Sequence, residues 1–284
     1  MIAFYMILCY SCTMEIKNNL KIRFEGEKFN FHHTLEHEPT LRTYYRHNHP
    51  SYELYVFFEG EVHFVVENKT YTVQPNTALL ICPLAYHYAK TLRSNVPYHR
   101  CAIDFDKSLV MPALQDFLPD STLVFQWDPN LFMSDLALVE KAIENGIEDE
   151  ITLACSLFVN KMLLHFKQEN AAMQTESAFN TTNQTVQEIL QFINAHIYEP
   201  LHIKDIADNL FLSSVYVSQL FSENMKISIM DYIKQKKILL AQNLIANGTK
   251  PTLAAQELGF SEYSTFFRLY KKYLGCTPSV HTPQ

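Results

Sequence analysis

The chain has 284 residues, enough for two domains that each bury a core. It carries 23 Lys and Arg residues against 30 Asp and Glu residues, and this net charge of −7 argues against a protein whose whole surface binds nucleic acid. The charge is uneven, because residues 181–284 hold 9 basic and 8 acidic residues while the rest of the chain holds 14 and 22. The C-terminal third is therefore the part best suited to contact nucleic acid.

The first twelve residues, MIAFYMILCYSC, are apolar, but they are too short to span a bilayer and lack the basic residues of a secretion signal. Two interpretations stay open: translation begins at Met14, which we favour, or residues 1–13 form an extra strand. The six cysteines are scattered, and Cys9 and Cys12 form a CxxC pair with no second pair to complete a zinc site. We therefore expect a reduced, cytoplasmic protein without a membrane segment.

Residues 21–106 alternate between apolar and polar side chains with a period close to two, and they are rich in Tyr, Phe, Val and Thr. Turn residues interrupt this pattern at Glu59-Gly60, Asn68-Lys69 and Pro75-Asn76. The pattern predicts an all-β antiparallel barrel or jelly roll, whose mouth can hold a small ligand.

Within this region, HNHPSYELYVFFEG at residues 47–60 resembles the first motif of the cupin family, and the Pro83 to His87 segment resembles a weaker second motif. The resemblance implies that His47, His49, Glu53 and His87 point into one barrel, and alternating strand positions permit this. Two interpretations remain. The four residues hold iron, manganese, zinc or nickel, or they line a ligand pocket without a metal. Further candidates for contact with a polar ligand are Arg42, Tyr44, Tyr55, His63 and Tyr88.

From Pro129 to about Gln168 the apolar spacing becomes helical. The second helix of this region has more apolar residues than a lone helix on a barrel needs, at Leu153, Leu157, Val159, Met162, Leu163 and Phe166. It forms a dimer seam or packs against its own barrel. Residues 170–184, NAAMQTESAFNTTNQ, are polar and predict a linker. An amphipathic helix follows from Thr185 and stops before Pro200.

The last hundred residues contain one pattern twice, IKDIADNLFLSSVYVSQLF at 203–221 and PTLAAQELGFSEYSTFFRLY at 251–270. Each copy predicts a short helix, a tight turn and a second helix that begins at a serine, Ser213 or Ser261. Residues 228–247 between the copies predict one long helix, with Lys234, Lys236 and Lys237 on its wetter side. Two such units can read DNA about one helical turn apart, roughly 34 Å.

This series resembles the DNA-binding domain of the AraC/XylS family of bacterial transcription regulators. The matching residues are Ile206-Ala207, Ser213, Leu220-Phe221, Tyr232, Ala255, Gly259-Phe260, Phe266, Arg268, Lys271-Lys272 and the closing Gly275 to Pro278. Lys226 departs from the pattern, because the family usually has Gly there; a positive φ at this position would cost about 1 kcal/mol. The resemblance implies a two-domain chain: a cupin-like sensor and dimerisation domain at 14–169, the linker at 170–184, and a double helix-turn-helix domain at 185–284.

The family resemblance also implies which side chains contact double-stranded promoter DNA. The residues expected to contact base edges are Val215, Ser218, Gln219, Tyr263, Ser264, Thr265, Phe267 and Arg268. Those expected to contact phosphates are Ser213, Ser214, Lys271 and Lys272. Arg268 is the best candidate for guanine, with a phosphate contact as its alternative role, and Phe267 is alternatively a core residue.

We therefore expect a ligand-responsive transcription regulator rather than an enzyme. The resemblance favours a metal-free pocket, a sugar as effector, a homodimer, RNA polymerase as a partner, and activation over repression. Two alternatives are a metal-dependent cupin enzyme fused to a DNA-binding module and a purely structural dimer module with an empty barrel.

Overall fold

A computed structural model describes residues 13–14, 20–26, 28–41, 43–44, 46–168 and 183–281. The chain divides into an N-terminal and a C-terminal compact unit, and each is described by itself. The apolar segment 1–12, Arg42 and most of the predicted linker lie outside the described residues. The domain boundaries at 14–169, 170–184 and 185–284 therefore stay a prediction.

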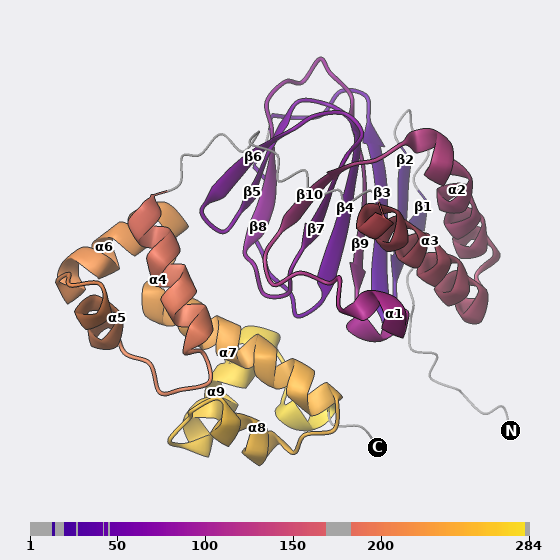
Figure 1. Cartoon of the computed structure of the whole chain (residues 1–284). Coiled ribbons are helices and arrows are strands. Elements are labelled where there is room, and N and C mark those ends of the chain that lie inside the picture. The colour runs from indigo at the N-terminus through magenta and orange to yellow at the C-terminus, as the bar shows by residue number, and fades with distance from the viewer. Residues whose placement is uncertain are drawn as a thin grey trace, which may run out of the picture. The chain divides into compact units, whose positions relative to one another are not determined.

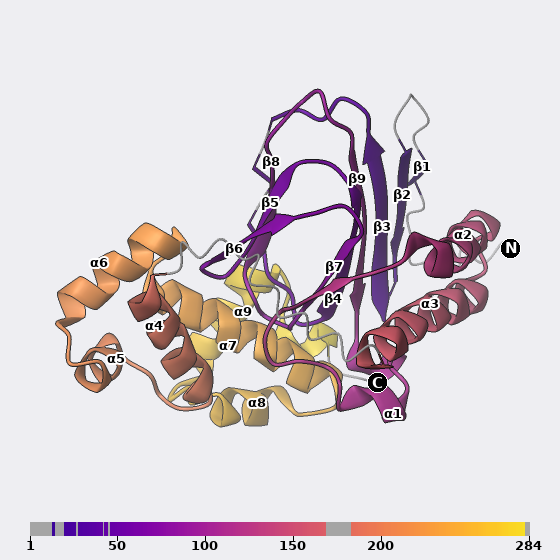
Figure 2. The ribbon, with the colours of Figure 1, turned by 45° about the horizontal axis from the view of Figure 1, so that its top comes forward.

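The N-terminal unit is built mainly from β-strands. The strands are β1 Thr13–Met14, β2 Leu20–Glu25, β3 Phe29–Glu36, β4 Tyr52–Glu59, β5 Val62–Val66, β6 Lys69–Val73, β7 Thr77–Ile81, β8 His87–Thr91, β9 Tyr98–Phe105 and β10 Leu123–Gln126. A seven-stranded sheet has the order β1-β2-β3-β9-β4-β7-β10, and a three-stranded sheet has the order β6-β5-β8. Figure 2 shows the smaller sheet across from strands β9 and β4 of the larger one. The predicted all-β N-terminal fold is confirmed.

Strand β9 shows how the larger sheet separates two cores. Cys101 and Ile103 belong to the core beneath the helices, while Tyr98 and Ala102 face the core between the sheets. Successive strand residues point to opposite faces, so apolar residues at both sets of positions bury both faces of the sheet. This is why β7, TALLI, is buried along its whole length.

Helices cover the outer face of the larger sheet (Figure 1). They are a short turn at Lys107–Leu109, α1 Pro112–Gln115, α2 Pro129–Asn145 and α3 Glu148–Gln168. The apolar residues of α3 divide into two groups. Those that pack into the core of its own unit are Val159, Met162, Leu163 and Phe166. Leu153 and Leu157 are instead 61% and 53% exposed, so of the six predicted residues these two remain candidates for a dimer seam.

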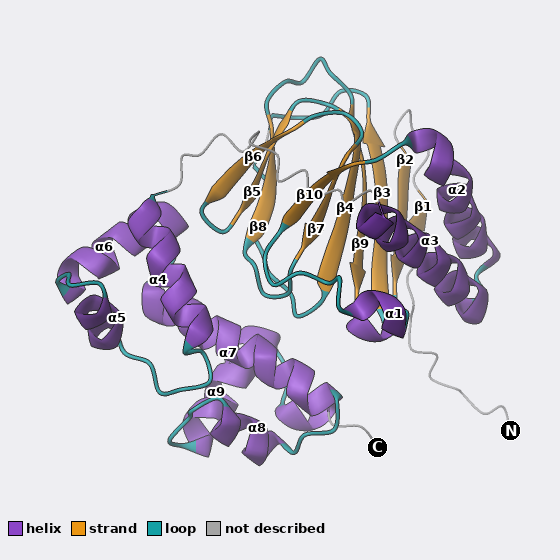
Figure 3. Ribbon diagram, viewed as in Figure 1, coloured by secondary structure: helices purple, strands orange, loops and turns teal. Residues whose placement is uncertain are grey.

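The C-terminal unit is helical (Figure 3). Its helices are α4 Gln184–Ala195, α5 Ile203–Asn209, α6 Ser214–Met225, α7 Ile229–Ala246, α8 Pro251–Glu257 and α9 Tyr263–Leu274, followed by a short turn at Pro278–His281. The pairs α5–α6 and α8–α9 are the two predicted helix-turn-helix units, and α7 joins them. The predicted all-α C-terminal fold is confirmed. Among the described residues, no helix has both the length and the apolar character needed to span a membrane.

The predicted serine caps are correct for one unit and wrong for the other. The Ser213 hydroxyl accepts a hydrogen bond from the Tyr216 backbone N–H at 3.2 Å, so it caps α6. Helix α9 has Glu262 as its N-cap residue, with no side-chain cap bond. The turn after α8 is one residue longer than the turn after α5, which moves Ser261 outside the helix.

The prediction that Lys236 and Lys237 lie on the wetter side of α7 is wrong, because both are buried, at 8% and 5% exposure. The Lys237 ammonium donates to the carbonyl oxygens of Glu199 at 2.6 Å and Leu258 at 2.7 Å. The Lys236 ammonium donates to Asn194 Oδ1 at 2.7 Å. Helices pack around most of α7, so these long side chains run through the core and satisfy their charges on polar groups at its edge.

Lys226 ends α6 in the left-handed conformation, with φ 53°. The sequence left open whether this position needs positive φ, and the structure shows that it does. A lysine here carries a strain of about 1–2 kcal/mol that a glycine would avoid.

Candidate functional site

A cavity of about 260 Å³ opens in the N-terminal unit, which we call the β-unit. Its lining is polar and aromatic, and consists of Arg23, His32, Tyr44, His47, Glu53, Tyr55, Phe64, His87, Tyr88, Ala89, Tyr98, Arg100, Ala102 and Asp104. Of the candidates for ligand contact, Tyr44, His47, Glu53, Tyr55, Tyr88 and His87 are in this lining, whereas His49 and His63 are not. Arg42 lies outside the described residues.

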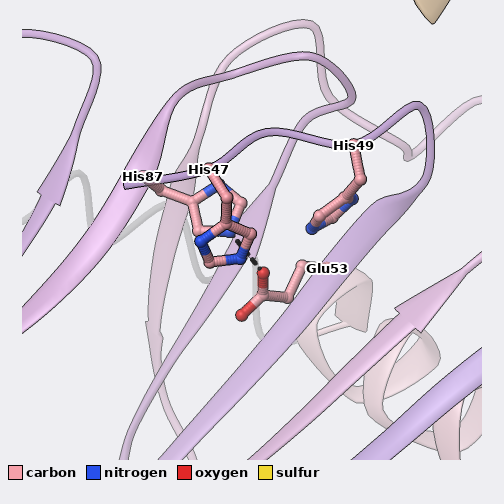
Figure 4. A group of neighbouring side chains, drawn as sticks. All are labelled: His47, His49, Glu53 and His87. Atoms are coloured by element: carbon pink, nitrogen blue, oxygen red, sulfur yellow. Dashed lines mark ion pairs between the residues drawn. The ribbon is translucent and has the colours of Figure 1, made fainter. Parts of the chain in front are cut away.

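The four residues of the cupin-like motifs lie close together (Figure 4), and three of them, His47, Glu53 and His87, line the cavity. A backbone bridge holds two of them side by side: the His87 N–H donates to the His47 carbonyl at 2.9 Å, and the His47 N–H donates back at 3.2 Å. Their ring centroids lie 4.3 Å apart. One donor atom from each of His47, His49, Glu53 and His87 lies within 4.8 Å of the others.

Glu53 and His87 form a buried pair inside this group. The Glu53 carboxylate lies 2.7 Å from His87 Nε2, and His87 Nδ1 faces the carbonyl of Ala85 at 2.9 Å. These two contacts fix the orientation of the imidazole ring. The whole set, three imidazoles and one carboxylate, also fits iron, manganese, zinc or nickel.

Strand β9 contributes lining residues that the sequence analysis did not single out as ligand candidates. Tyr98, Arg100, Ala102 and Asp104 alternate along the strand and line the cavity. The Tyr98 hydroxyl lies 3.0 Å from the Tyr55 hydroxyl in a buried hydrogen bond. Burial raises the pKa of both phenols, so both stay neutral and can donate or accept. The period-two spacing in YHRCAIDF was the available signal.

In the C-terminal unit, the residues predicted to contact DNA lie on the outer faces of α6 and α9. Val217 and Phe221 anchor α6 in the core, and Phe266 and Tyr270 anchor α9. The exposed residues are Ser213, Ser214, Val215, Gln219, Tyr263, Ser264, Phe267, Arg268, Lys271 and Lys272, while Ser218 and Thr265 are half-buried. Phe267, at 37% exposure, is not a core residue.

Two family models match the chain. Residues 33–146 match the AraC-like ligand binding domain, and residues 206–282 match a helix-turn-helix domain. Together they cover more than half of the chain. The chain belongs to the AraC family of transcription regulators. Both models describe parts of such regulators, and neither describes an enzyme.

Relatives of this AraC-family chain are also regulators. An uncharacterised HTH-type transcriptional regulator, YfiF of Bacillus subtilis, is 20% identical over 82% of this chain and 77% of its own length. The transcriptional regulatory protein HptR of Staphylococcus aureus and an uncharacterised response regulatory protein of Staphylococcus epidermidis are 30% and 32% identical. Each of these matches covers 35% of this chain and only 39% of the relative.

Solved structures give more distant likenesses. ToxT from Vibrio cholerae is 16% identical, and the match covers 88% of this chain and 96% of that chain, with a TM-score of 0.37. The C-terminal domain of the response regulator yesN of Fusobacterium nucleatum is 27% identical over 34% of this chain and 96% of that chain, with a TM-score of 0.33.

Proposed function

We propose that this AraC-family protein is a sequence-specific transcription regulator whose binding to promoter DNA changes when a small polar ligand occupies the β-unit cavity. One observation carries the proposal: the same chain has a cavity lined by polar and aromatic side chains and two helix-turn-helix units whose second helices each have an exposed face. A ligand that binds one arrangement of the protein better than another shifts the population toward that arrangement. Occupancy of the DNA sites changes with it.

The ligand contacts would come from the polar lining of the cavity. The predicted residues are Arg42, Tyr44, His47, His49, Glu53, Tyr55 and His87, and five of them, Tyr44, His47, Glu53, Tyr55 and His87, are in that lining. Phenol hydroxyls, imidazoles and a carboxylate offer both donors and acceptors, which is what a hydroxyl-rich molecule such as a carbohydrate needs. Carbohydrate is therefore the ligand class that we favour.

The DNA contacts would divide between the two recognition helices. On α6, Gln219 would pair with adenine and Val215 would touch a thymine methyl; on α9, Arg268 would pair with guanine. The serines and lysines at the helix ends would meet phosphates. The C-terminal unit has few basic residues, so each subunit would bind only moderately, and a homodimer would add affinity by binding two half-sites. Activation through RNA polymerase, in the cytoplasm, completes this proposal.

The test of DNA recognition uses the full-length protein and fragments of the intergenic region next to its gene. Binding is measured from low to high salt, with scrambled fragments of equal length as competitor. Preferred binding to one fragment at physiological salt is the expected result. Equal binding to all fragments, lost together as salt rises, would contradict sequence-specific recognition.

The four-donor cluster favours a second candidate: a metal-dependent cupin activity attached to a DNA-binding unit. Elemental analysis of purified protein separates the two. We expect less than one transition metal per chain, because Glu53 and His87 contact each other directly, with 2.7 Å between a carboxylate oxygen and Nε2. One metal per chain that disappears in His49→Ala would support the second candidate.

A further inference from the structure

The charged residues of the cavity lie in successive rows across the larger sheet, where one row, or level, is a set of register partners on neighbouring strands. At one level Glu53 on β4 is the register partner of Asp104 on β9. At the next level inward along β9, Ala102 pairs with Tyr55 on one side and His32 on the other. Arg100 lies one level further, beside Phe57. Side chains two residues apart share a face, so the cavity has an acidic end and a basic end with a small alanine between them.

Arg100 provides the basic end with a permanent charge. Burial alone would lower the pKa of its guanidinium, but Tyr98, Tyr55 and Glu53 outweigh this and raise it. Among the described residues no carboxylate forms an ion pair with Arg100. Glu53 acts on it only at a distance, and its own carboxylate is paired with His87.

The other basic side chains in the lining contribute less charge to the interior. His32 stays neutral near pH 7, because burial, Arg23 and Arg100 lower its pKa to about 4. Arg23 is more than half exposed, and it lies 3.9 Å from the Glu25 carboxylate. Arg100 is therefore the main positive charge that faces a molecule inside the cavity.

We infer that the effector is a small hydroxylated molecule with one carboxylate, such as a sugar acid, and that Arg100 binds this carboxylate. A guanidinium presents parallel N–H donors that match the two oxygens of a carboxylate. The inference rests on the proposed ligand-sensing function and names the ligand class. Tyr44, Tyr55 and Tyr98 belong to the same lining, and phenol hydroxyls suit the hydroxyl groups of the ligand.

The volume of the cavity and the charges in its lining narrow the class of ligand further. The volume of about 260 Å³ is just below the roughly 300–1,000 Å³ of typical small-molecule sites, which suits a monosaccharide. A phosphate dianion would bring a second negative charge. Among the described residues the lining offers one inner arginine and holds Glu53 and Asp104 at its other end, so a carboxylate is the better match.

The test is calorimetric titration of the full-length protein with matched ligands: galactose, galacturonate, the neutral amide of galacturonate, and galactose 6-phosphate, with the corresponding gluco series. We expect at least one acid to bind at least tenfold more tightly than its amide, which has the same shape without the charge. In Arg100→Gln the acid should lose about tenfold to a hundredfold in affinity, the effect of one charge-assisted hydrogen-bonded pair. The affinity for the amide should not change.

The matched control is Arg93→Gln, which removes an arginine that is exposed and paired with Glu61 outside the cavity lining. This variant should bind like the wild type. If Arg100→Gln does not fold, the comparison of acid with amide on the wild type decides. Equal or tighter binding of the amide, tighter binding of the phosphate, or no binding of any acid would overturn the inference. DNA binding that responds to a neutral sugar would still leave the proposed function intact.

Discussion

Phe211 and Gly259 occupy the same position in the turns of the two helix-turn-helix units. Both have left-handed backbone conformations, with φ of 56° and 69°. In each turn the next residue donates its N–H to the helix before it, Leu212 to Ala207 at 2.9 Å and Phe260 to Ala255 at 3.0 Å. The two positions differ in their surroundings, because Gly259 is packed against backbone atoms and Phe211 faces solvent. A Cβ at Gly259 would lie 2.7 Å from the backbone of Pro200, whereas the Phe211 side chain is 96% exposed.

Gly259→Ala should therefore destabilise the C-terminal unit by about 2–4 kcal/mol, since it adds both backbone strain and a clash with backbone atoms. Phe211→Gly should raise stability slightly, by no more than about 1 kcal/mol, because relief of strain exceeds the entropy lost by glycine. Urea unfolding followed by circular dichroism measures both. A Gly259→Ala protein as stable as the wild type would contradict the close approach of Pro200.

Arg268 gives a direct test of base reading. Its side chain is exposed on α9, and its guanidinium lies 3.5 Å from Thr265 Oγ1. Arg268→Ala should weaken specific binding about tenfold, since one bidentate contact with guanine contributes about 1–3 kcal/mol of discrimination. Equal weakening on specific and scrambled DNA would show that Arg268 contacts a phosphate instead.

The exposed leucines of α3 test dimerisation. Leu153 and Leu157 line an apolar groove with Leu138 of α2. If a second copy covers this groove, Leu157→Glu would place a charge in the seam and shift the protein toward monomer in sedimentation analysis. Leu41→Glu is the control, because Leu41 is 63% exposed and lies outside the groove. A wild type that is monomeric at micromolar concentration would rule out the seam.

His99 should make the β-unit sensitive to acid. Burial first, and then its neighbour His33, lower the pKa of His99 from 6.5 to about 4. His33 Nε2 lies 2.7 Å from His99 Nε2, and Glu140 binds the other nitrogen of His33. Between pH 6.5 and 4 the unfolded chain binds a proton that the folded chain does not, so the stability conferred by neutral His99 falls as pH drops. His99→Gln should flatten this fall in unfolding experiments. Parallel pH curves would contradict it.

Local signals were enough to predict the helices of the C-terminal unit. Pro251 begins α8, and Ser213 caps α6, because both act within one turn of the chain. The burial of Lys237 was not predictable, since it depends on Glu199 and Leu258, which the helix pattern does not bring near α7. The prediction that Ser261 caps α9 was wrong because the turn after α8 is one residue longer than the turn after α5. The apolar pattern of the two units does not show this difference.

The cavity was predictable only in part. His47, His49 and Glu53 stand out because they fall within one short motif, and His87 stands out because it ends a second one. Arg100 did not stand out, because both faces of β9 are covered, and alternation along such a strand does not tell which face meets the cavity and which meets the helices. The pairing of β9 with both β3 and β4 decides this, and it is non-local.

Control of DNA binding by a ligand in the cavity can be measured as the affinity of the full-length protein for its preferred DNA fragment, with and without each ligand of the sugar and sugar-acid panel. A variant with a filled cavity, Ala102→Leu, is measured in parallel. We expect at least one ligand to change the DNA affinity of the wild type several-fold and to leave the DNA affinity of Ala102→Leu unchanged. The contradictory result would be a DNA affinity that no ligand alters, or a response that persists when the cavity is filled.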